Sequence, residues 1–166
     1  MYTENLSYLA KFFLDHKNLQ NELSAFYFYV LCERKKDGCH MVGYFSKEKE
    51  NLENNLSCIM VLPSCQGTGY GKFIVDFSYS LSLIEKRQGS PEKPLSDLGH
   101  RTYVSYWTNR VLNFLLDNKN PNLAIQDIAD ATGITVKDIQ YVLDSYQILR
   151  REQNKYFLFT EPTYLK

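Results

Sequence analysis

The sequence predicts a mixed α/β core with a mainly antiparallel sheet, followed by a small helical region. Three observations lead to this fold class. Apolar strand-like runs follow one another between residues 25 and 62, a Gly-rich loop then leads into a helical pattern, and helical spacing dominates after residue 98. The chain has 166 residues, 44% of them hydrophobic, which is enough to bury one sizeable core. We expect two regions, residues 1–100 and residues 101–166.

The first part of the chain predicts one helix and three strands. Apolar residues recur at helical spacing over 6–14. The aromatic and β-branched run 25–32, a turn at 35–38 and the run 40–45 predict a β-hairpin. A third strand over 56–62 is stopped by the proline that follows it. Three strands in succession predict a meander.

The rest of the chain predicts further helices and a final strand. Residues 70–84 form a helical pattern, and we expect Gly89 to close that helix in a left-handed conformation. Residues 90–94 must be extended, because prolines disfavour a helical residue before them. Helical spacing returns from about residue 98, short helices are expected on both sides of a turn at Gly133, and residues 156–159 predict a strand. This closing order of helix, turn, helix and strand resembles a winged helix.

Composition and charge exclude several classes of protein. Nineteen basic and nineteen acidic residues give a formal net charge of zero, so the whole chain has no electrostatic footprint for nucleic acid or an anionic membrane. The segment 136–146 carries Lys137 but also Asp138 and Asp144, so we do not expect direct DNA binding. The longest apolar run, 25–32, is far shorter than the roughly 20 residues of a membrane span, and we expect no membrane association.

The four cysteines are interpreted as reduced thiols. The first residues lack the basic and apolar segments of a secretion signal, so the disulfide-forming compartments are not expected. Cys39 and His40 stand together without the paired spacing of a structural zinc site. We therefore expect no metal.

The most informative motif is the Gly-rich loop Gln66-Gly67-Thr68-Gly69-Tyr70-Gly71, which stands between a strand and a helix. The N-terminus of a helix offers unpaired N–H groups and a favourable dipole to an anion, so phosphate is the natural ligand. Glycines can also merely close a tight turn, and alone the motif leaves the two interpretations about even. The spacing of Gln66, Gly69 and Gly71 is that of the pyrophosphate loop in acyl-CoA-dependent N-acetyltransferases.

Several uninterrupted stretches make the resemblance specific. The chain resembles the MYST family of lysine acetyltransferases in the stretches FFLDHK, GCHMVGYFSKEK, SCIMVLP, GYGKFIVDFSY and GSPEKPLSDLG, at 12–17, 38–49, 57–63, 69–79 and 89–99. The resemblance implies an acyl-CoA N-acyltransferase core of the GNAT type in residues 1–100, with a winged-helix-like region in 101–166. It implies transfer of an acetyl group from acetyl-CoA to a lysine amine of a histone tail, with H4 as the type of substrate.

The resemblance also implies which residues bind the acetyl-CoA. Backbone groups of the third strand would contact the cofactor, a loop would hold its diphosphate, and two serines would complete the site. The strand residues are Ile59, Met60 and Val61. The loop residues are Gln66, Gly67, Thr68, Gly69, Tyr70, Gly71 and Lys72, and the two serines are Ser96 and Ser105. Where the family has Arg followed by Lys or Arg, this chain has Gly67 and Thr68, so we expect weaker cofactor binding.

The implied catalytic pair is Glu92 and Cys58. A substrate lysine with a pKa near 10.4 must lose a proton before it attacks, and Glu92 matches the family's general base. We expect this carboxylate to be partly desolvated. Cys58 matches the family's active-site cysteine, although an unpaired cysteine on an apolar strand is also an ordinary core residue. Direct attack and a two-step route through Cys58 both stay open, with Glu92 essential and Cys58 supportive.

The resemblance carries further expectations about context. Lys17 matches a lysine that family members autoacetylate. A nuclear location and chromatin-complex partners follow from the family alone. Family catalytic domains carry an upstream zinc-binding part, so we expect that this chain represents a catalytic domain without it. The alternative function is a catalytically weak or inactive scaffold that binds acyl-CoA or partner proteins.

Overall fold

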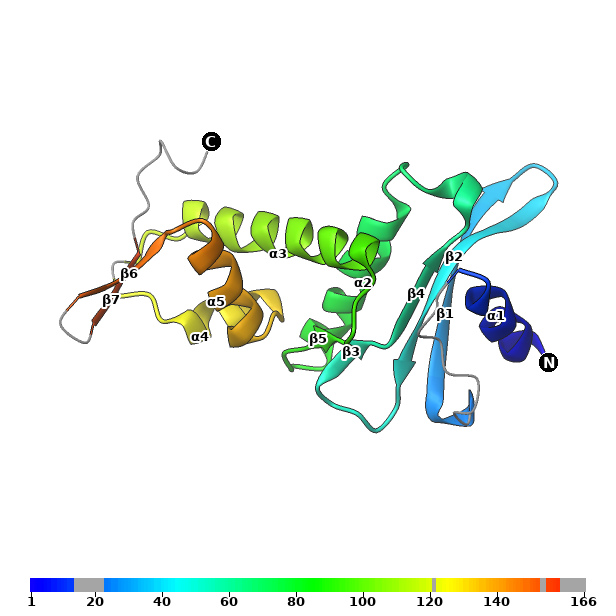
Figure 1. Ribbon diagram of the computed structural model, residues 1–166, viewed down its shortest axis with the longest axis horizontal. Helices are drawn as coiled ribbons and strands as arrows, with labels where there is room; N and C mark the ends of the chain where they lie inside the picture. Colours follow the sequence, from blue (N-terminus) through cyan, green and yellow to red (C-terminus); the bar gives the residue numbers. More distant parts are fainter. Residues whose placement is uncertain (14–22, 121, 153–154, 159–166) are drawn as a thin grey trace.

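The computed structural model has the predicted mixed α/β architecture, with one antiparallel sheet between two helical layers (Figure 1). The structure describes residues 1–13, 23–120, 122–152 and 155–158. Its elements, in chain order, are α1 (Tyr2–Lys11), η1 (Leu23–Ala25), β1 (Phe26–Lys35), β2 (Gly38–Glu48), β3 (Asn54–Leu56), β4 (Cys58–Val61), η2 (Pro63–Cys65), α2 (Tyr70–Ile84), β5 (Ser90–Pro91), α3 (Asp97–Asp117), α4 (Ile125–Thr132), α5 (Val136–Ser145), β6 (Leu149–Glu152) and β7 (Lys155–Leu158).

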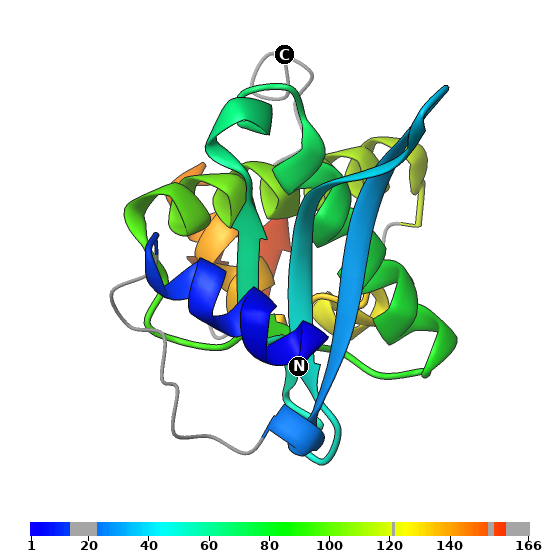
Figure 2. The same cartoon turned by 90° about the vertical axis from the view of Figure 1, so that its right-hand side faces the viewer.

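The sheet has the strand order β1-β2-β4, with both neighbouring pairs antiparallel, which confirms the predicted meander. Alternate residues of β2 face opposite helices. Tyr44 packs with Leu6 and Ala10 of α1, whereas Phe45 packs with Ile74 of α2. Figure 2 shows α1 lying across one face of the sheet. The central strand β2 is therefore covered on both faces and paired on both edges, and its residues 42–47 are all buried.

The predicted third strand is in fact two short strands with different partners. β4 pairs with β2, but β3 pairs with β5 in parallel, with Leu56 opposite Pro91. The prediction of one continuous strand over 56–62 was wrong because the chain changes partners at Ser57. An apolar run does not show which neighbour each of its residues will find. Because β3 pairs with β5, the segment that follows α2 lies beside the residues just before β4.

Gly89 has a different role from the one expected. It does not close α2, because the left-handed residue after that helix is Lys86, with a φ of 53°. Gly89 instead allows close packing: a Cβ at this position would lie 2.6 Å from the Cβ of Asn55. Its N–H donates to the carbonyl of Gly133 at 2.9 Å, and the Nδ2 of buried Asn55 donates to Ser78 Oγ. The glycine thus fixes β5 beside β3.

Helices α3, α4 and α5 pack on α2 around a second core. This core is rich in aromatic residues, and the indole Nε1 of Trp107 donates to the hydroxyl of Tyr79 at 2.6 Å. Burial raises the pKa of the Tyr79 phenol well above its ordinary value. The turn predicted at Gly133 is present and left-handed, with a φ of 72°, and the side chain of Thr135 caps α5. The core includes residues of α2, so it crosses the expected boundary between residues 100 and 101.

One half-buried ion pair joins β2 to the end of α2. The Nζ of Lys47, whose side chain is 2% exposed, lies 2.6 Å from Oε1 of Glu85, and Arg87 also pairs with this carboxylate. Burial alone would raise the pKa of Glu85, but the hydrogen bonds from the two cations outweigh it and lower this pKa below its ordinary value. Within the described part of the chain, no helix is both long enough and apolar enough to cross a bilayer.

Candidate acetyl-transfer site

The Gly-rich loop stands between the end of β4 and the N-terminus of α2. Gly67 and Gly69 are both left-handed, with φ values of 76° and 94°, and a Cβ at either would have no atom within 4 Å. The backbone N–H groups of residues 67–72 donate to no other residue among those described. The dipole of α2 adds positive potential at this end. Open space beside unpaired N–H groups is the environment that a diphosphate requires.

Side chains hold this loop against β4. Gln66 Nε2 donates to the carbonyl of Val61 at 3.1 Å, and Thr68 Oγ1 donates to the carbonyl of Cys65 at 2.6 Å. A Cβ at Gly71 would lie 4.0 Å from Val61 Cγ2, so α2 begins close to the strand. The loop and the strand therefore form one continuous surface.

Cys58 is the first residue of β4 and faces α1. Its Sγ lies 3.7 Å from the hydroxyl of Tyr44, which also donates to the carbonyl of Leu6 at 3.3 Å. Because a phenol has one hydrogen, donation to Leu6 leaves the oxygen lone pairs of Tyr44 to accept from the thiol. Burial, followed by the neighbouring Cys58, raises the pKa of Tyr44 above its ordinary value, so this hydroxyl stays protonated. The thiol of Cys58 and the hydroxyl of Tyr44 thus lie within hydrogen-bonding distance of each other.

Tyr44 was missed in the sequence analysis. The signal was the register of the hairpin: Ser46 lies opposite Cys58, so Tyr44, two residues away on the same face of β2, points to the same side of the sheet. Alternation along β2 could have identified it once the pairing of β2 with β4 was assumed.

Glu92 follows β5, and a backbone hydrogen bond joins it to the end of β3. Its backbone N–H donates to the carbonyl of Leu56 at 2.9 Å, which places the residue beside the chain two positions before Cys58. The structure thus brings the segments of the predicted catalytic pair together. The Glu92 side chain is exposed, so the partial desolvation expected from the sequence is not supplied by the described residues themselves. Bound substrates would have to supply it.

β4 is an outer strand of the sheet, so part of its backbone faces away from β2. Leu62 N–H donates to Val42 O, so the alternation of antiparallel pairs turns the N–H and C=O of Ile59 and Val61 away from β2. Met60 points toward α1 and is buried. By the same alternation the backbone groups of Met60 face Tyr44 of β2, and the backbone contacts of Ile59, Met60 and Val61 with the cofactor stay a prediction.

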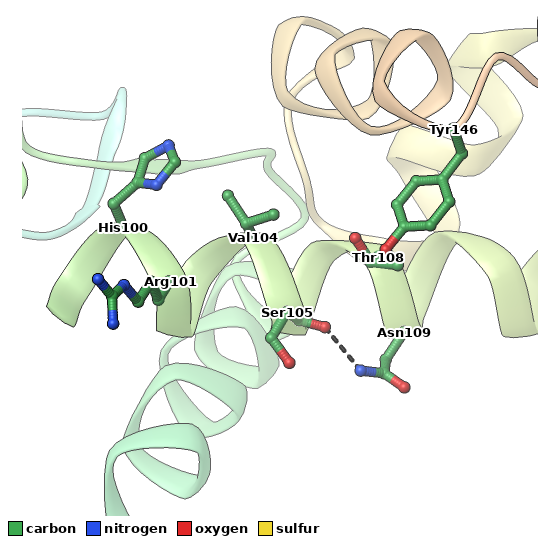
Figure 3. A pocket seen from close by; sticks show the side chains of 7 residues that line it. All are labelled: His100, Arg101, Val104, Ser105, Thr108, Asn109 and Tyr146. Carbon is green, nitrogen blue, oxygen red and sulfur yellow. Dashed lines mark hydrogen bonds between the residues drawn. The ribbon is translucent and has the colours of Figure 1, made fainter. Parts of the chain in front are cut away.

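The two predicted serines occupy different surroundings. Ser96 is the N-cap of α3, and its Oγ accepts from the N–H of Gly99 at 3.1 Å. Ser105 lies further along α3 and lines a pocket of about 450 Å³ (Figure 3). The pocket's other lining residues are His100, Arg101, Val104, Thr108, Asn109 and Tyr146. Neither Cys58 nor Glu92 lines it, so the pocket lies apart from the catalytic pair.

Two further expectations concern Lys17 and metal ions. Lys17 lies outside the described residues. Among the described residues, no group of three or more His, Cys, Asp or Glu side chains is arranged to hold a metal ion. None of the four cysteines forms a disulfide.

Comparison with known proteins decides the family. The profile of the MOZ/SAS family matches residues 1–166. The chain belongs to the MOZ/SAS family. Its curated relatives include the "Histone acetyltransferase of the MYST family 2" of Arabidopsis thaliana, which is 48% identical over 166 residues. Human "Histone acetyltransferase KAT6A" is 46% identical over 164 residues, and "Histone acetyltransferase ESA1" of Yarrowia lipolytica is 43% identical over 155 residues. The resemblance to the MYST family is confirmed.

The matched part is one region of longer MOZ/SAS family proteins. The alignments cover 99%, 92% and 93% of this chain but 37%, 8% and 33% of the Arabidopsis, human and Yarrowia relatives. The chain thus spans about a third of the length of the Arabidopsis relative. The glycine loop, Cys58 and Glu92 all lie inside the matched region.

Proposed function

We propose that this chain is the acetyl-CoA-binding part of a protein lysine acetyltransferase that acts on histone tails. One observation carries the proposal. Residues 56–72 form a single structural unit in which Leu56 holds the backbone of Glu92, Cys58 begins β4, and the unpaired N–H groups of the glycine loop follow its end. A base, a thiol and an anion site along one strand match the reaction that the names of the relatives describe.

The chain's own groups suit the acetyl-CoA that the proposal requires. The loop N–H groups would bind the diphosphate, and the outward backbone groups of Ile59, with the N–H of Val61, would hold the arm that leads to the thioester. Met60, the loop residues Gln66 to Lys72, Ser96 and Ser105 complete the proposed cofactor set. The bound cofactor supplies an acetyl group activated as a thioester. No metal is part of the proposal.

Glu92 would act as the general base. It takes the proton from the lysine ammonium, and the neutral amine then attacks the acetyl carbon, so that an N–C bond forms while the C–S bond breaks. The exposed carboxylate becomes useful when bound cofactor and peptide exclude water, because desolvation raises the pKa of a carboxyl group. Burial of Glu92 on substrate binding would then raise its pKa and make it a stronger base.

Cys58 would support the reaction without being its obligatory nucleophile. Its contact with Tyr44 is with a hydroxyl that stays protonated and cannot act as a base at neutral pH. Activation of a thiol requires a neighbouring base or a cation. Direct attack of the amine on acetyl-CoA and a two-step route through Cys58 both stay open, and Cys58 has a supporting role in the proposal.

The names of the relatives describe histone acetylation, and the rest of the biological setting is proposed from the family resemblance. We propose a histone tail of the H4 type as the protein substrate, chromatin-complex subunits as partners, and a nuclear location. Autoacetylation at Lys17 belongs to the same proposal.

A specific observation favours the alternative of a weak or inactive scaffold that binds acyl-CoA or partners. The loop carries Gly67 and Thr68 where a cation would strengthen diphosphate binding, and Gly67 is left-handed, a conformation that L side chains rarely adopt. The family's arginine would therefore not fit this loop without a rearrangement of its backbone.

Transfer of a labelled acetyl group to an H4 tail peptide distinguishes the two functions. The proposal predicts label on the peptide and none on a control peptide whose lysines are replaced by arginine. Calorimetry measures acetyl-CoA binding in parallel. Binding without any transfer would overturn the enzyme assignment and establish the scaffold.

A further inference from the structure

The position of Glu92 along β3 differs from the one that a regular ladder would give. Ser90 lies opposite Asn54 in the parallel pairing of β5 with β3. In a regular parallel ladder, the N–H of Glu92 would then donate to the carbonyl of Asn55. It donates instead to Leu56 O, at 2.9 Å. Glu92 thus lies one residue further along the chain, a step of roughly 3.3 Å toward β4.

A bulge at Asn55 causes this step. Asn54 lies opposite Ser90. Leu56 lies opposite Pro91, so two residues of β3 advance against one residue of β5. A bulge adds a residue to one strand and changes the direction of the side chains beside it. The bulge therefore sets how close the end of β5 comes to the start of β4.

The side chain of Asn55 fixes the bulge to α2. Asn55 is 2% exposed, and its Nδ2 donates to Ser78 Oγ at 3.1 Å. The Ser78 hydroxyl donates its single hydrogen to Val75 O at 2.7 Å, so its lone pairs are left to accept from the amide. Because the glycine loop leads into the same helix, this bond ties the bulge to the element that begins at the proposed diphosphate site.

Gly89 brings β5 directly against Asn55. A Cβ at Gly89 would lie 2.6 Å from Asn55 Cβ and 3.3 Å from its backbone nitrogen. The Gly89 N–H also donates to Gly133 O at 2.9 Å, in the turn before α5. These contacts fix the start of the segment, so a change in the bulge has to be absorbed further along, at Glu92.

Packing alone does not explain an asparagine at this position. Among the residues that the structure describes, no donor reaches Asn55 Oδ1. A buried polar atom without a partner destabilises a fold, and an apolar side chain of similar size avoids this cost. The amide of Asn55 therefore fits a role in placing β5.

We propose that Asn55 is a positioning residue that holds Glu92 at the distance from the substrate lysine that proton transfer requires. The inference rests on the proposed function, in which Glu92 is the general base. Asn55 is buried, so it acts through the bulge and its contact with Gly89 rather than by touching the substrates. A base takes a proton only within hydrogen-bond reach, so a slip of Glu92 along β3 slows the reaction without weakening acetyl-CoA binding.

Amide hydrogen exchange tests the positioning independently of activity. Asn55→Ala should speed the exchange of the Glu92 amide by about tenfold or more, while the amides between β2 and β4 keep their protection. Asn54→Ala is the matched control, because it is the same substitution one residue earlier in β3. Among the described residues the Asn54 side chain forms no hydrogen bond, so this variant should leave the exchange unchanged. Unchanged exchange of the Glu92 amide in Asn55→Ala overturns the proposal.

Single-turnover acetyl transfer tests the catalytic consequence. Asn55→Ala should lower the rate at neutral pH by about tenfold or more, with Kd for acetyl-CoA within about twofold of the wild type. The defect should shrink toward pH 10, where the lysine loses its proton without a base, and Asn55→Ala should cause no further loss in a Glu92→Gln background. A defect that is equal at every pH, or that adds to the loss in Glu92→Gln, shows a general structural effect and contradicts the positioning role.

Two further measurements keep the outcomes separate. Ser78→Ala removes the acceptor of the Asn55 amide but leaves Asn55 in place, so it should give the same changes in smaller measure even if Asn55→Ala does not fold. If Glu92→Gln keeps full activity, the proposed function fails and the catalytic part of this inference fails with it, whereas amide exchange still decides whether Asn55 places the segment. If activity depends on Glu92 but Asn55→Ala combines faster exchange with full activity, only the positioning role is overturned.

Discussion

The two outer strands of the three-stranded sheet differ in what they offer. At β4, four residues carry a thiol, outward backbone groups and a neighbouring glycine loop, and the backbone of Glu92 is held just before them. At β1, residues 26–31 are aromatic or aliphatic, and Cys32 and three charged residues follow them. Both outer strands depend on the same buried strand, β2, which pairs with each of them. One buried strand thus supports two outer strands of different composition, and only the β4 side carries the groups of the proposed chemistry.

The largest effect is expected from Glu92→Gln. The amide has nearly the shape of the carboxylate but cannot take a proton, so acetyl transfer falls by about 100-fold or more. Acetyl-CoA affinity, measured by calorimetry, stays unchanged because the loop is intact. Glu53→Gln, an exposed glutamate in the nearby loop, is the matched control and keeps full activity. An equal loss of acetyl transfer in Glu92→Gln and Glu53→Gln would show that Glu92 is not the general base.

A smaller effect is expected from Cys58→Ala. If Cys58 supports the reaction without forming a covalent intermediate, its removal lowers the rate by less than about 100-fold, whereas loss of an obligatory nucleophile costs far more. Single-turnover kinetics measure the rate, and mass spectrometry looks for an acetyl group on Cys58 in the wild type. Cys65→Ala provides the control for loss of a thiol. Transient acetylation of Cys58, together with complete loss in Cys58→Ala, would establish the two-step route.

Thr68→Arg should strengthen acetyl-CoA binding. The new cation beside the diphosphate adds a charge-assisted hydrogen bond, which lowers Kd by roughly three- to tenfold, less at high salt. Ser80→Arg adds the same charge on α2, away from its N-terminus, and should leave Kd unchanged. Unchanged affinity in Thr68→Arg would mean that the loop does not face the diphosphate.

The ion pair between Lys47 of β2 and Glu85 at the end of α2 gives a pH dependence of stability. The pKa of Glu85 is lowered in the folded state, so its ion pairs stabilise the fold above the unfolded pKa, and this stability is lost as the pH falls below about 4.5. Urea unfolding of the wild type and Glu85→Gln across the acidic range measures the difference. The free energies of unfolding should converge at low pH. A constant difference would show that the carboxylate charge is not responsible.

The smallest catalytic effect is expected at the opposite edge. Tyr27→Lys should leave kcat/KM for peptide acetylation within about twofold of the wild type, because exposed substitutions far from a site change little. A large loss of activity in this variant would show that the two edges are coupled.

The sequence predicted most of the fold because its signals are local. The hairpin, the helix after the glycine loop and the turn at Gly133 each follow from spacing and turn residues within a short segment. The errors concern long-range partners. The division of the third strand at Ser57 and the packing of Gly89 on Asn55 depend on β5, which lies more than thirty residues further along the chain. Local patterns do not encode such pairing.

The candidate site shows the same limit. The glycine loop was located from its residues, and the structure adds that its N–H groups are unpaired and open. Glu92 was found only through the family resemblance, because a glutamate in an extended segment has no local signal. The hydrogen bond of Tyr44 with Cys58 required the register of β2 with β4.

The pH dependence of single-turnover acetyl transfer tests the central claim most directly. A general base is needed only while the substrate lysine, with a pKa near 10.4, is protonated. The account predicts that Glu92→Gln is severely slowed at neutral pH and that its rate rises roughly tenfold per pH unit toward pH 10, so the gap from the wild type closes. A defect of the same size at every pH would contradict the role of Glu92 as the base.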